Sequence, residues 1–271
     1  MGILVELDKV AGDVLKDTRD ILIFIGRLLL ISTFIEDGFR MWHQWTEHTE
    51  YIGNTWNWQT EVATVVVGIN LAGQVLCAFM VLFRILVTPS VVALALIVVI
   101  QTIVYSIIFD VKFLMRHLAM IGALLLLLAE HKDRRAQQQK KKTIVGLPVL
   151  DEHSPSSGLQ FFGRIFLVLL FCTLLHFWGI KKEVLNDTFG LFFILLIVAG
   201  WKTRLCSLIL IIWLGCLNFF VNDFWSHADT SMMYDFKRYD FFQTLTVIGG
   251  LKILIALGPG HYSLDYEKKG I

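Results

Sequence analysis

Long hydrophobic segments separated by short polar ones dominate the pattern of this chain. A transmembrane helix needs about 20 mostly apolar residues to cross the hydrocarbon core of a bilayer. Eight segments approach that length: 21–42, 62–87, 89–109, 111–130, 159–179, 188–201, 203–223 and 239–257. The pattern therefore predicts an all-α fold, a polytopic membrane protein with about eight transmembrane helices. The sixth segment is the shortest, and the first and fourth contain charged residues.

Composition favours the same class of protein. Of the 271 residues, 56% are hydrophobic and 17% are charged, whereas soluble domains contain about 25% charged residues. The formal net charge is +1, so the chain has no overall basic field that would attract nucleic acid. We therefore expect membrane lipid around the chain and no nucleic-acid partner.

The first and fifth hydrophobic segments resemble each other, and so do the fourth and eighth. The shared polar positions are Gly26, Arg27, Asp110 and Lys112 in the first half and Gly163, Arg164, Asp235 and Lys237 in the second. These matches predict two four-helix repeats. The repeats would be parallel, because an even number of helices leaves both halves in the same orientation. Chance similarity between leucine-rich helices is the alternative.

The distribution of Lys and Arg orients the predicted helices. The segment 43–60 contains neither residue, whereas the segment 131–157 contains six of them. By the positive-inside rule, the basic segment and both termini face the cytosol, although Lys181 and Lys182 fall on the opposite side. The predicted regions are a cytosolic segment 1–20, a first membrane repeat 21–130, a basic cytosolic linker 131–157, a second membrane repeat 158–258 and a cytosolic tail 259–271.

Charged residues gather at the predicted lumenal ends of the helices, close to aromatic ones. The candidates are Glu36, Asp37, Arg40, Asp110, Lys112, Arg116, Asp235, Lys237, Tyr239 and Asp240. Glu36 and Arg40 lie four residues apart on one helical face. Charges in a membrane helix are costly and are usually paired or functional. One interpretation is a set of structural ion pairs, and the other is a surface that recognises short peptide segments.

The sequence lacks the patterns expected of an enzyme or a metal site. It contains no HExxH motif and no phosphate-binding glycine loop, and its four cysteines lie inside apolar segments without a CxxC pair. Of the eight histidines, only His117 and His176 fall within predicted spans. We therefore expect no catalytic activity and no cofactor. The glycosylation sequon at Asn186 lies so close to the membrane that we expect poor use.

The chain finishes in "KKGI", with Lys268 and Lys269 at the fourth- and third-last positions. In a membrane protein with a cytosolic tail, this arrangement resembles the dilysine signal that coat proteins read when they return proteins to the endoplasmic reticulum. Such signals are addresses and not anchors. Two ordinary solvated lysines are the alternative.

Several long strings carry a resemblance to a known family. They are "LISTFIEDGFRMW" (30–42), "QTIVYSIIFDVKFLMRHLA" (101–119), "TLLHF" (173–177), "YDFFQTLTVIGGL" (239–251), "ALGPG" (256–260) and the terminal "KKGI". Together they resemble the surfeit locus protein 4 family of cargo receptors over essentially the whole chain. Each half also looks like the four-helix DoxX-type membrane fold. The segment "HKDRRAQQQKKKTIVG" departs from the family in length and basic character.

The resemblance implies a receptor that binds soluble secretory proteins, lipoproteins among them, in the lumen of the endoplasmic reticulum, often through an exposed N-terminal tripeptide. It further implies export in COPII carriers and return in COPI carriers from the intermediate compartment and the Golgi. The DoxX-like halves leave a second interpretation open, a membrane oxidoreductase partner or small-molecule carrier. A homo- or hetero-oligomer is compatible with either.

Overall fold

The described part of the chain is built from α-helices. The computed structural model describes residues 19–109, 111–142, 158, 161–165, 167–168, 181–229 and 231–257, without the side chains of 19, 111–112, 139–142 and 181–187. The helices are α2 (Arg19–His43), α3 (Trp45–Trp56), α4 (Thr60–Leu82), α5 (Val87–Val104), α6 (Val111–Lys142), α8 (Lys181–Ala199), α9 (Thr203–Val221) and α10 (Met232–Leu257), with short 3-10 turns η1 (Ile107–Phe109) and η2 (Phe224–Ser226). The predicted all-α class is confirmed within these ranges.

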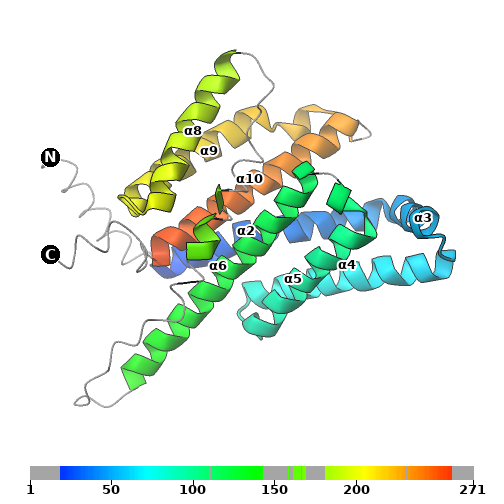
Figure 1. Cartoon of the computed structure of the whole chain (residues 1–271), viewed down its shortest axis with the longest axis horizontal. Helices are drawn as coiled ribbons and strands as arrows, with labels where there is room; N and C mark the ends of the chain where they lie inside the picture. Colours follow the sequence, from blue (N-terminus) through cyan, green and yellow to red (C-terminus); the bar gives the residue numbers. More distant parts are fainter. Residues whose placement is uncertain are drawn as a thin grey trace, which may run out of the picture.

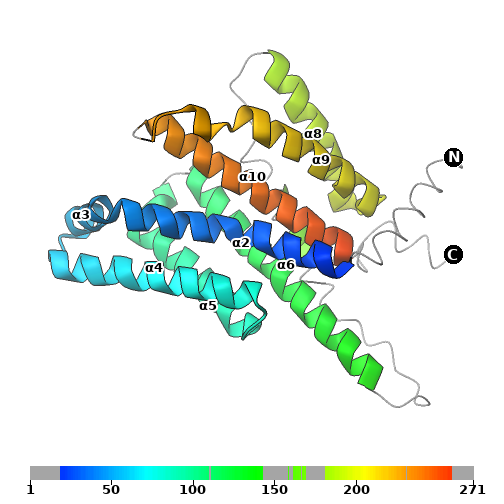
Figure 2. The same cartoon turned by 180° about the vertical axis from the view of Figure 1, so that it is seen from behind.

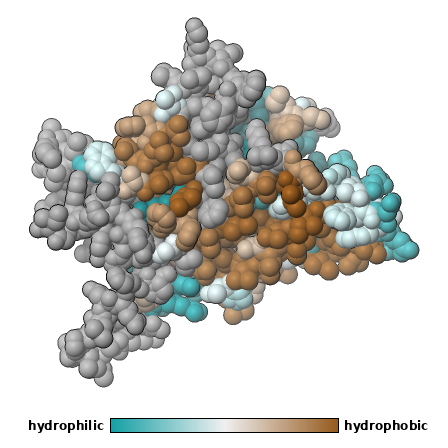
Figure 3. Space-filling view, in the orientation of Figure 1, coloured by the Kyte–Doolittle hydropathy of each residue, from teal (hydrophilic) through white to brown (hydrophobic). Residues whose placement is uncertain are grey.

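Within the described ranges, five helices are long and apolar enough to cross a membrane, namely α4, α5, α6, α9 and α10. In Figure 3, hydrophobic residues cover most of the coloured surface between the polar end at α3 and the opposite end. The chain is therefore a multi-pass membrane protein. The count of eight stays a prediction: α2 carries internal charges, the segment 159–179 lies mostly outside the described residues, and the apolar part of α8, Thr188–Ala199, is short.

Several boundaries differ from the predicted ones because polar residues also form helix. The segment 43–60, which the hydropathy pattern left between spans, contains the helix α3. The helix α4 ends at Leu82, so Arg84 lies in a turn outside it. The helix α5 begins at Val87 with Leu86 in the left-handed region at φ 46°. The helix α6 continues to Lys142, into the predicted linker.

The helices α2 and α10 pack along each other at the centre of the bundle (Figures 1 and 2). The contact is close because glycines face each other: a Cβ on Gly249 would lie 2.6 Å from the backbone nitrogen of Leu30 and 2.7 Å from the carbonyl oxygen of Gly26. Thr33 on α2 also donates a hydrogen bond of 3.0 Å to the carbonyl oxygen of Phe242 on α10. Helix α4 covers another side of α2, and α9 covers α10.

The second half repeats one detail of this packing. A Cβ on Gly163 would lie 2.9 Å from the Leu126 side chain on α6, and one on Gly250 would lie 2.7 Å from Leu167. The residues 161–168 that are described thus contact α6 and α10 closely. Arg27 and Arg164, the matching arginines, are both buried. The arrangement as two parallel repeats stays a prediction.

Three basic segments lie at the same end of the bundle. The α4–α5 turn with Arg84, the α8–α9 turn with Lys202, and the final part of α6 all lie on the side where α2 begins and α10 ends (Figure 1). Helix α3, the end of α2 and the start of α10 lie at the opposite end (Figures 1 and 2). The long helices α2, α4, α5, α6, α9 and α10 therefore alternate in direction along the bundle (Figure 1).

A fully buried ion pair joins three helices near the basic end. Arg27 Nε donates a hydrogen bond of 2.9 Å to Glu130 Oε2, and its Nη1 donates one of 3.1 Å to the carbonyl oxygen of Val81. The second Glu130 oxygen lies 2.7 Å from Arg134 Nε, and Arg134 also pairs with Asp20. Arg27 and Glu130 are both 0% exposed, so the two charges are satisfied by each other and not by water.

Candidate functional site

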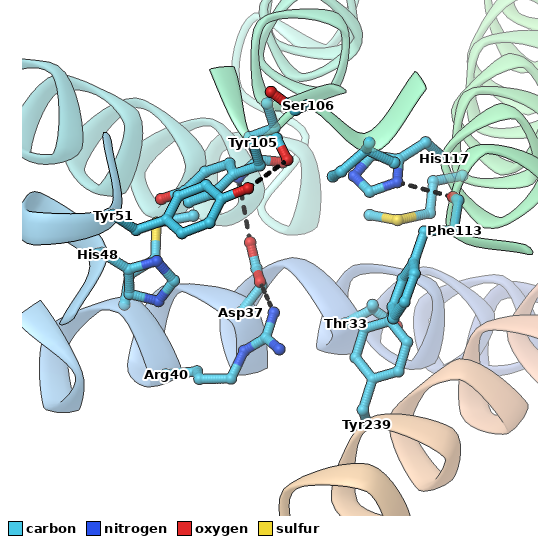
Figure 4. Close-up of a pocket in the computed structure, with 14 residues that line it drawn as sticks. Thr33, Asp37, Arg40, His48, Tyr51, Tyr105, Ser106, Phe113, His117 and Tyr239 are labelled. Carbon is cyan, nitrogen blue, oxygen red and sulfur yellow. Dashed lines mark hydrogen bonds and ion pairs between the residues drawn. The ribbon is translucent and has the colours of Figure 1, made fainter. Parts of the chain in front are cut away.

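A cavity of about 430 Å³ lies at the end of the bundle where α3 meets α2, α5, α6 and α10 (Figure 4). Its lining residues are Thr33, Asp37, Arg40, Met41, His48, Tyr51, Gln101, Tyr105, Ser106, Ile107, Phe113, His117, Met120 and Tyr239. Charged, amide and hydroxyl groups share the lining with methionine and aromatic side chains. This mixture suits a ligand that carries both polar groups and apolar side chains.

Asp37 is the most heavily bonded group in the cavity. Its Oδ2 accepts a hydrogen bond of 3.0 Å from Gln74 Nε2 and one of 3.1 Å from Gln101 Nε2. Gln101 Nε2 also donates to Gln74 Oε1 at 2.8 Å, which locks the two amides together. Arg40, one helical turn further along α2, pairs with the other carboxylate oxygen. The carboxylate is thus fixed by α2, α4 and α5 together.

Tyr239 on α10 lies between two guanidinium groups. The Arg116 guanidinium lies 4.9 Å from the centre of the Tyr239 ring, and that of Arg40 lies 5.4 Å from it. Arg116 also forms a 3.0 Å ion pair with Asp240 and lies 5.6 Å from the Phe113 ring. These cation–π contacts hold α2, α6 and α10 around one wall of the cavity.

Three buried polar atoms of the lining have no hydrogen-bond partner among the described residues. They are Arg40 Nε, His48 Nε2 and the Tyr105 hydroxyl. A buried polar atom without a partner is costly, and these three atoms leave hydrogen-bonding capacity in the cavity wall. Burial also lowers the pKa of His48, with the positive charge of Arg40 as the second cause.

Helix α3 closes one side of the cavity through contacts with the end of α5. Tyr51 donates a hydrogen bond of 3.2 Å to the carbonyl oxygen of Tyr105, and their rings stack with centroids 5.9 Å apart. Trp56 Nε1 donates one of 2.9 Å to the carbonyl oxygen of Val104. His48 packs edge-on against Tyr105 at 5.5 Å. The short polar helix therefore contributes the aromatic rim.

The structure brings some of the predicted site residues together and separates others. Asp37, Arg40 and Tyr239 line the cavity, and Arg116 and Asp240 form the ion pair beside it. Glu36 and Arg40, four residues apart on one face of α2, contact different residues. Arg40 pairs with Asp37, and Glu36 lies 3.4 Å from Arg238 on α10.

The remaining candidates are outside the cavity lining or outside the description. Asp235 accepts a hydrogen bond of 3.3 Å from Gln44, and Lys237 pairs with Asp223. Asp110 is not among the described residues, and neither are Lys268 and Lys269; for Lys112 only the backbone is described.

Of the fourteen residues that line the cavity, sequence reasoning identified three, Asp37, Arg40 and Tyr239. Gln74 and Gln101, which hold Asp37 in place, could have been identified from the sequence. An amide inside an otherwise apolar span is costly unless it is paired, so each of them indicates a polar partner within the bundle. His48 and Tyr51 lie just outside the predicted spans, where aromatic residues are expected at any membrane interface. Their position in the cavity follows from the turn between α2 and α3 and could not be read from spacing. Tyr105 falls within the predicted span 89–109, at the end of α5, where an aromatic residue is equally unremarkable.

The described residues contain no group of three or more His, Cys, Asp or Glu side chains arranged to hold a metal ion. Cys77 and Cys216 are free thiols, the Cys206 thiol donates a hydrogen bond of 3.5 Å to the carbonyl oxygen of Trp201, and Cys172 lies outside the description. The side chains that line the cavity offer charge, hydrogen-bonding groups and aromatic surface.

The fold and the site define a multi-pass α-helical membrane protein with a polar, aromatic-lined cavity at one end. Residues 2–271 match the SURF4 family, and the chain belongs to that family. It is 42% identical to the Surfeit locus protein 4 homolog of Drosophila melanogaster over 98% of this chain and 97% of that protein.

More distant relatives match over similar lengths of the chain. The Surfeit locus protein 4 homolog of Schizosaccharomyces pombe is 29% identical over 90% of this chain and 81% of its own. The ER-derived vesicles protein ERV29 of Saccharomyces cerevisiae is 26% identical over 90% of this chain and 76% of its own. No solved structure gives a significant match to this chain.

Proposed function

We propose that the chain is a non-catalytic cargo receptor of the endoplasmic reticulum membrane. It binds soluble secretory proteins in the lumen, enters COPII carriers toward the Golgi, and returns in COPI carriers through Lys268 and Lys269. Family membership and the printed name of the yeast relative, an ER-derived vesicles protein, support a role in vesicle traffic. The cavity around Asp37 and Arg40 is the observation that carries the binding step.

The cavity suits a short peptide segment. Asp37 offers a negative charge to an amino group. Arg40 Nε and the Tyr105 hydroxyl, both without partners among the described residues, offer donors to backbone carbonyls. Met41, Met120 and Phe113 offer apolar surface to side chains. A volume of about 430 Å³ falls in the range of roughly 300–1,000 Å³ typical of ligand sites, which admits a few residues and not a folded domain.

The distribution of basic segments supports the orientation that this function requires. Arg84, the final part of α6 and the α8–α9 turn lie at the end away from the cavity. By the positive-inside rule, that end faces the cytosol and the cavity faces the lumen. Both termini, and with them the dilysine tail, then lie in the cytosol, where coat proteins can reach the tail. Lys181 and Lys182 are the main exception, and the arginines at the cavity end, Arg40, Arg116 and Arg238, lie in ion pairs.

The binding step is tested by neutralising the charged pair while keeping its shape. The double variant Asp37→Asn/Arg40→Gln is returned to cells that lack the gene, and soluble secretory proteins retained in the lumen are quantified together with the membrane abundance of the receptor. We expect retention at normal receptor abundance. The matched control is Asp223→Asn/Lys237→Gln, an ion pair outside the cavity lining, which should restore secretion. Restored secretion with the Asp37/Arg40 variant would contradict cargo binding in this cavity.

The same cells separate the receptor from the alternative of a small-molecule carrier or oxidoreductase partner. A receptor defect retains secretory proteins while metabolite flux stays normal, whereas a carrier defect alters flux first.

The recycling step is tested separately at the tail. In the variant Lys268→Ser/Lys269→Ser, we expect the steady-state location to shift toward the Golgi, because the COPI signal is lost. The neighbouring Glu267→Gln serves as a control that changes charge without touching the lysine pair. An unchanged location of the lysine variant would reject the retrieval signal and leave the cavity proposal intact.

A further inference from the structure

The last part of α6 extends beyond the other helices at the basic end of the bundle (Figures 1 and 2). The helix has 32 residues, which at about 1.5 Å per residue is clearly longer than the roughly 30 Å hydrocarbon core. Its first part is apolar, and its final segment reads "HKDRRAQQQKKK" (131–142). We call 131–142 the basic extension of α6. It begins where the apolar span ends, and therefore at the level of the lipid headgroups.

The positive charges of this extension differ in what they contact. Arg134 is directed into the protein, where it lies 2.7 Å from Glu130 and pairs with Asp20. Lys132 and Arg135 are exposed and form no ion pair with any other residue that the structure describes. The three consecutive lysines Lys140–Lys142 follow on the same helix. Arg134 is thus structural, Lys132 and Arg135 are exposed, and Lys140–Lys142 add three further positive charges to the helix.

The basic extension is a local concentration of charge in a nearly neutral chain. The formal net charge of the whole chain is +1, and Asp133, the single acidic residue of the extension, accepts a hydrogen bond of 2.8 Å from Gln137. Arg84, which is exposed in the α4–α5 turn, lies at the same end of the bundle. A cluster of this size directly after a transmembrane helix attracts anionic headgroups, at distances within one Debye length.

We propose that the basic extension of α6 binds anionic phospholipid headgroups of the leaflet in which α6 ends. Lysine ammonium groups act as point charges suited to phosphate, and the headgroups are the anions nearest to the end of the span. A nucleic-acid partner does not fit, because the rest of the chain adds no basic field around this helix. The proposal rests on the position and charges of α6 and not on the cargo cavity.

The full-length protein reconstituted in phosphatidylcholine vesicles tests this interaction. Spin-labelled phosphatidylserine and spin-labelled phosphatidylcholine are added as probes, and the motionally restricted fraction of each gives the association constant of one relative to the other. We expect a preference of about fivefold for phosphatidylserine at low salt, which decreases in 1 M NaCl because the contacts are electrostatic.

The variant Lys132→Ser/Arg135→Ser/Lys140→Ser/Lys141→Ser/Lys142→Ser should lower the preference to below twofold, or about that of a neutral surface. Arg134 is left unchanged so that its pairs with Glu130 and Asp20 survive. The control Lys181→Ser/Lys182→Ser removes two charges at the start of α8 and should keep the preference. A variant with arginine at the four lysine positions keeps the charge and should also keep it.

An unchanged preference in the serine variant would overturn the proposal and assign the lipid selectivity to other basic residues. No preference in the unaltered protein would overturn it as well, and an acidic protein surface would then be the remaining kind of partner.

Discussion

Arg116 on α6 and Asp240 on α10 form an ion pair in which Nη2 and Oδ1 are 3.0 Å apart. The pair joins a helix of the first half to one of the second, directly beside the cavity. The arginine side chain is 7% exposed and the aspartate side chain 24% exposed, so water screens the pair only in part. The same guanidinium lies over Tyr239, and one residue therefore orients both the carboxylate and the aromatic wall.

Replacing Arg116 with Ala should lower the free energy of unfolding by about 2–3 kcal/mol, because Asp240 loses its partner in a mostly buried place. Unfolding in mixed detergent micelles with increasing SDS measures this loss. Lys237→Ala is the matched control: Lys237 and its partner Asp223 are 27% and 30% exposed, and the loss should stay below about 1 kcal/mol. Equal losses in the two variants would contradict the special burial of the Arg116 pair.

Gly249→Ala should destabilise the bundle by about 1–3 kcal/mol, because the new methyl group meets the backbone of α2 at Leu30 and Gly26 and the two helices must move apart. Gly215→Ala on α9 is the comparison, since nothing lies within 4 Å of the position of its Cβ. That substitution should be neutral or stabilise the helix by up to about 1 kcal/mol. Thermal unfolding of both variants in detergent distinguishes them. A neutral effect at Gly249 would mean that α2 and α10 pack less closely than described.

The membrane class and most helix positions could be predicted from the sequence, because a segment of apolar residues long enough to cross a bilayer is recognisable without knowledge of the fold. The ion pairs and hydrogen bonds between helices could not be predicted. The spacing of Glu36 and Arg40 is correct for a pair on one helix, yet Glu36 lies beside Arg238 on α10 and Arg40 pairs with Asp37. Local spacing is a weak guide when another helix offers a partner, and the sequence does not show which helices become neighbours.

Only the residues of the cavity that lie on or beside predicted spans could be identified from the sequence. Asp37, Arg40 and Tyr239 were candidates because charged residues in or near a membrane helix are usually paired or functional, and Tyr239 lies next to such residues in the sequence. The helix α3 was missed because its 12 residues are too few and too polar to produce a spanning signal. With α3 unknown, the contribution of His48 and Tyr51 could not be inferred.

Arg27→Met should destabilise the protein by about 3–5 kcal/mol, because it leaves Glu130 buried without its main partner. The double variant Arg27→Met/Glu130→Met should recover most of the loss and unfold within about 1 kcal/mol of the unaltered protein, since no buried charge then lacks a partner in this contact. Unfolding curves of the single and double variants give the coupling energy between the two residues. Simple addition of the two single losses would contradict the direct pair.

Stability should decrease with acidification through His48. Burial lowers the pKa of this imidazole in the folded protein below the value of about 6.5 that it has in the unfolded chain. The folded state therefore favours the neutral ring, and its contribution to stability is complete above pH 6.5 and is lost as the pH decreases below 6.5. Melting temperatures between pH 7.5 and 5.0 should show a smaller decline for His48→Gln than for the unaltered protein. Parallel declines would exclude His48 as the cause.

The glycine contact between α2 and α10 has a consequence for how the protein is made. Helix α2 leaves the ribosome long before α10, and at about 5–20 residues per second the interval is on the order of ten seconds or more. During that time the surface of α2 that α10 later covers, including Thr33 and Glu36, faces lipid or a membrane chaperone. Products that stop before α10 keep that surface exposed, and cellular quality control can recognise them by it.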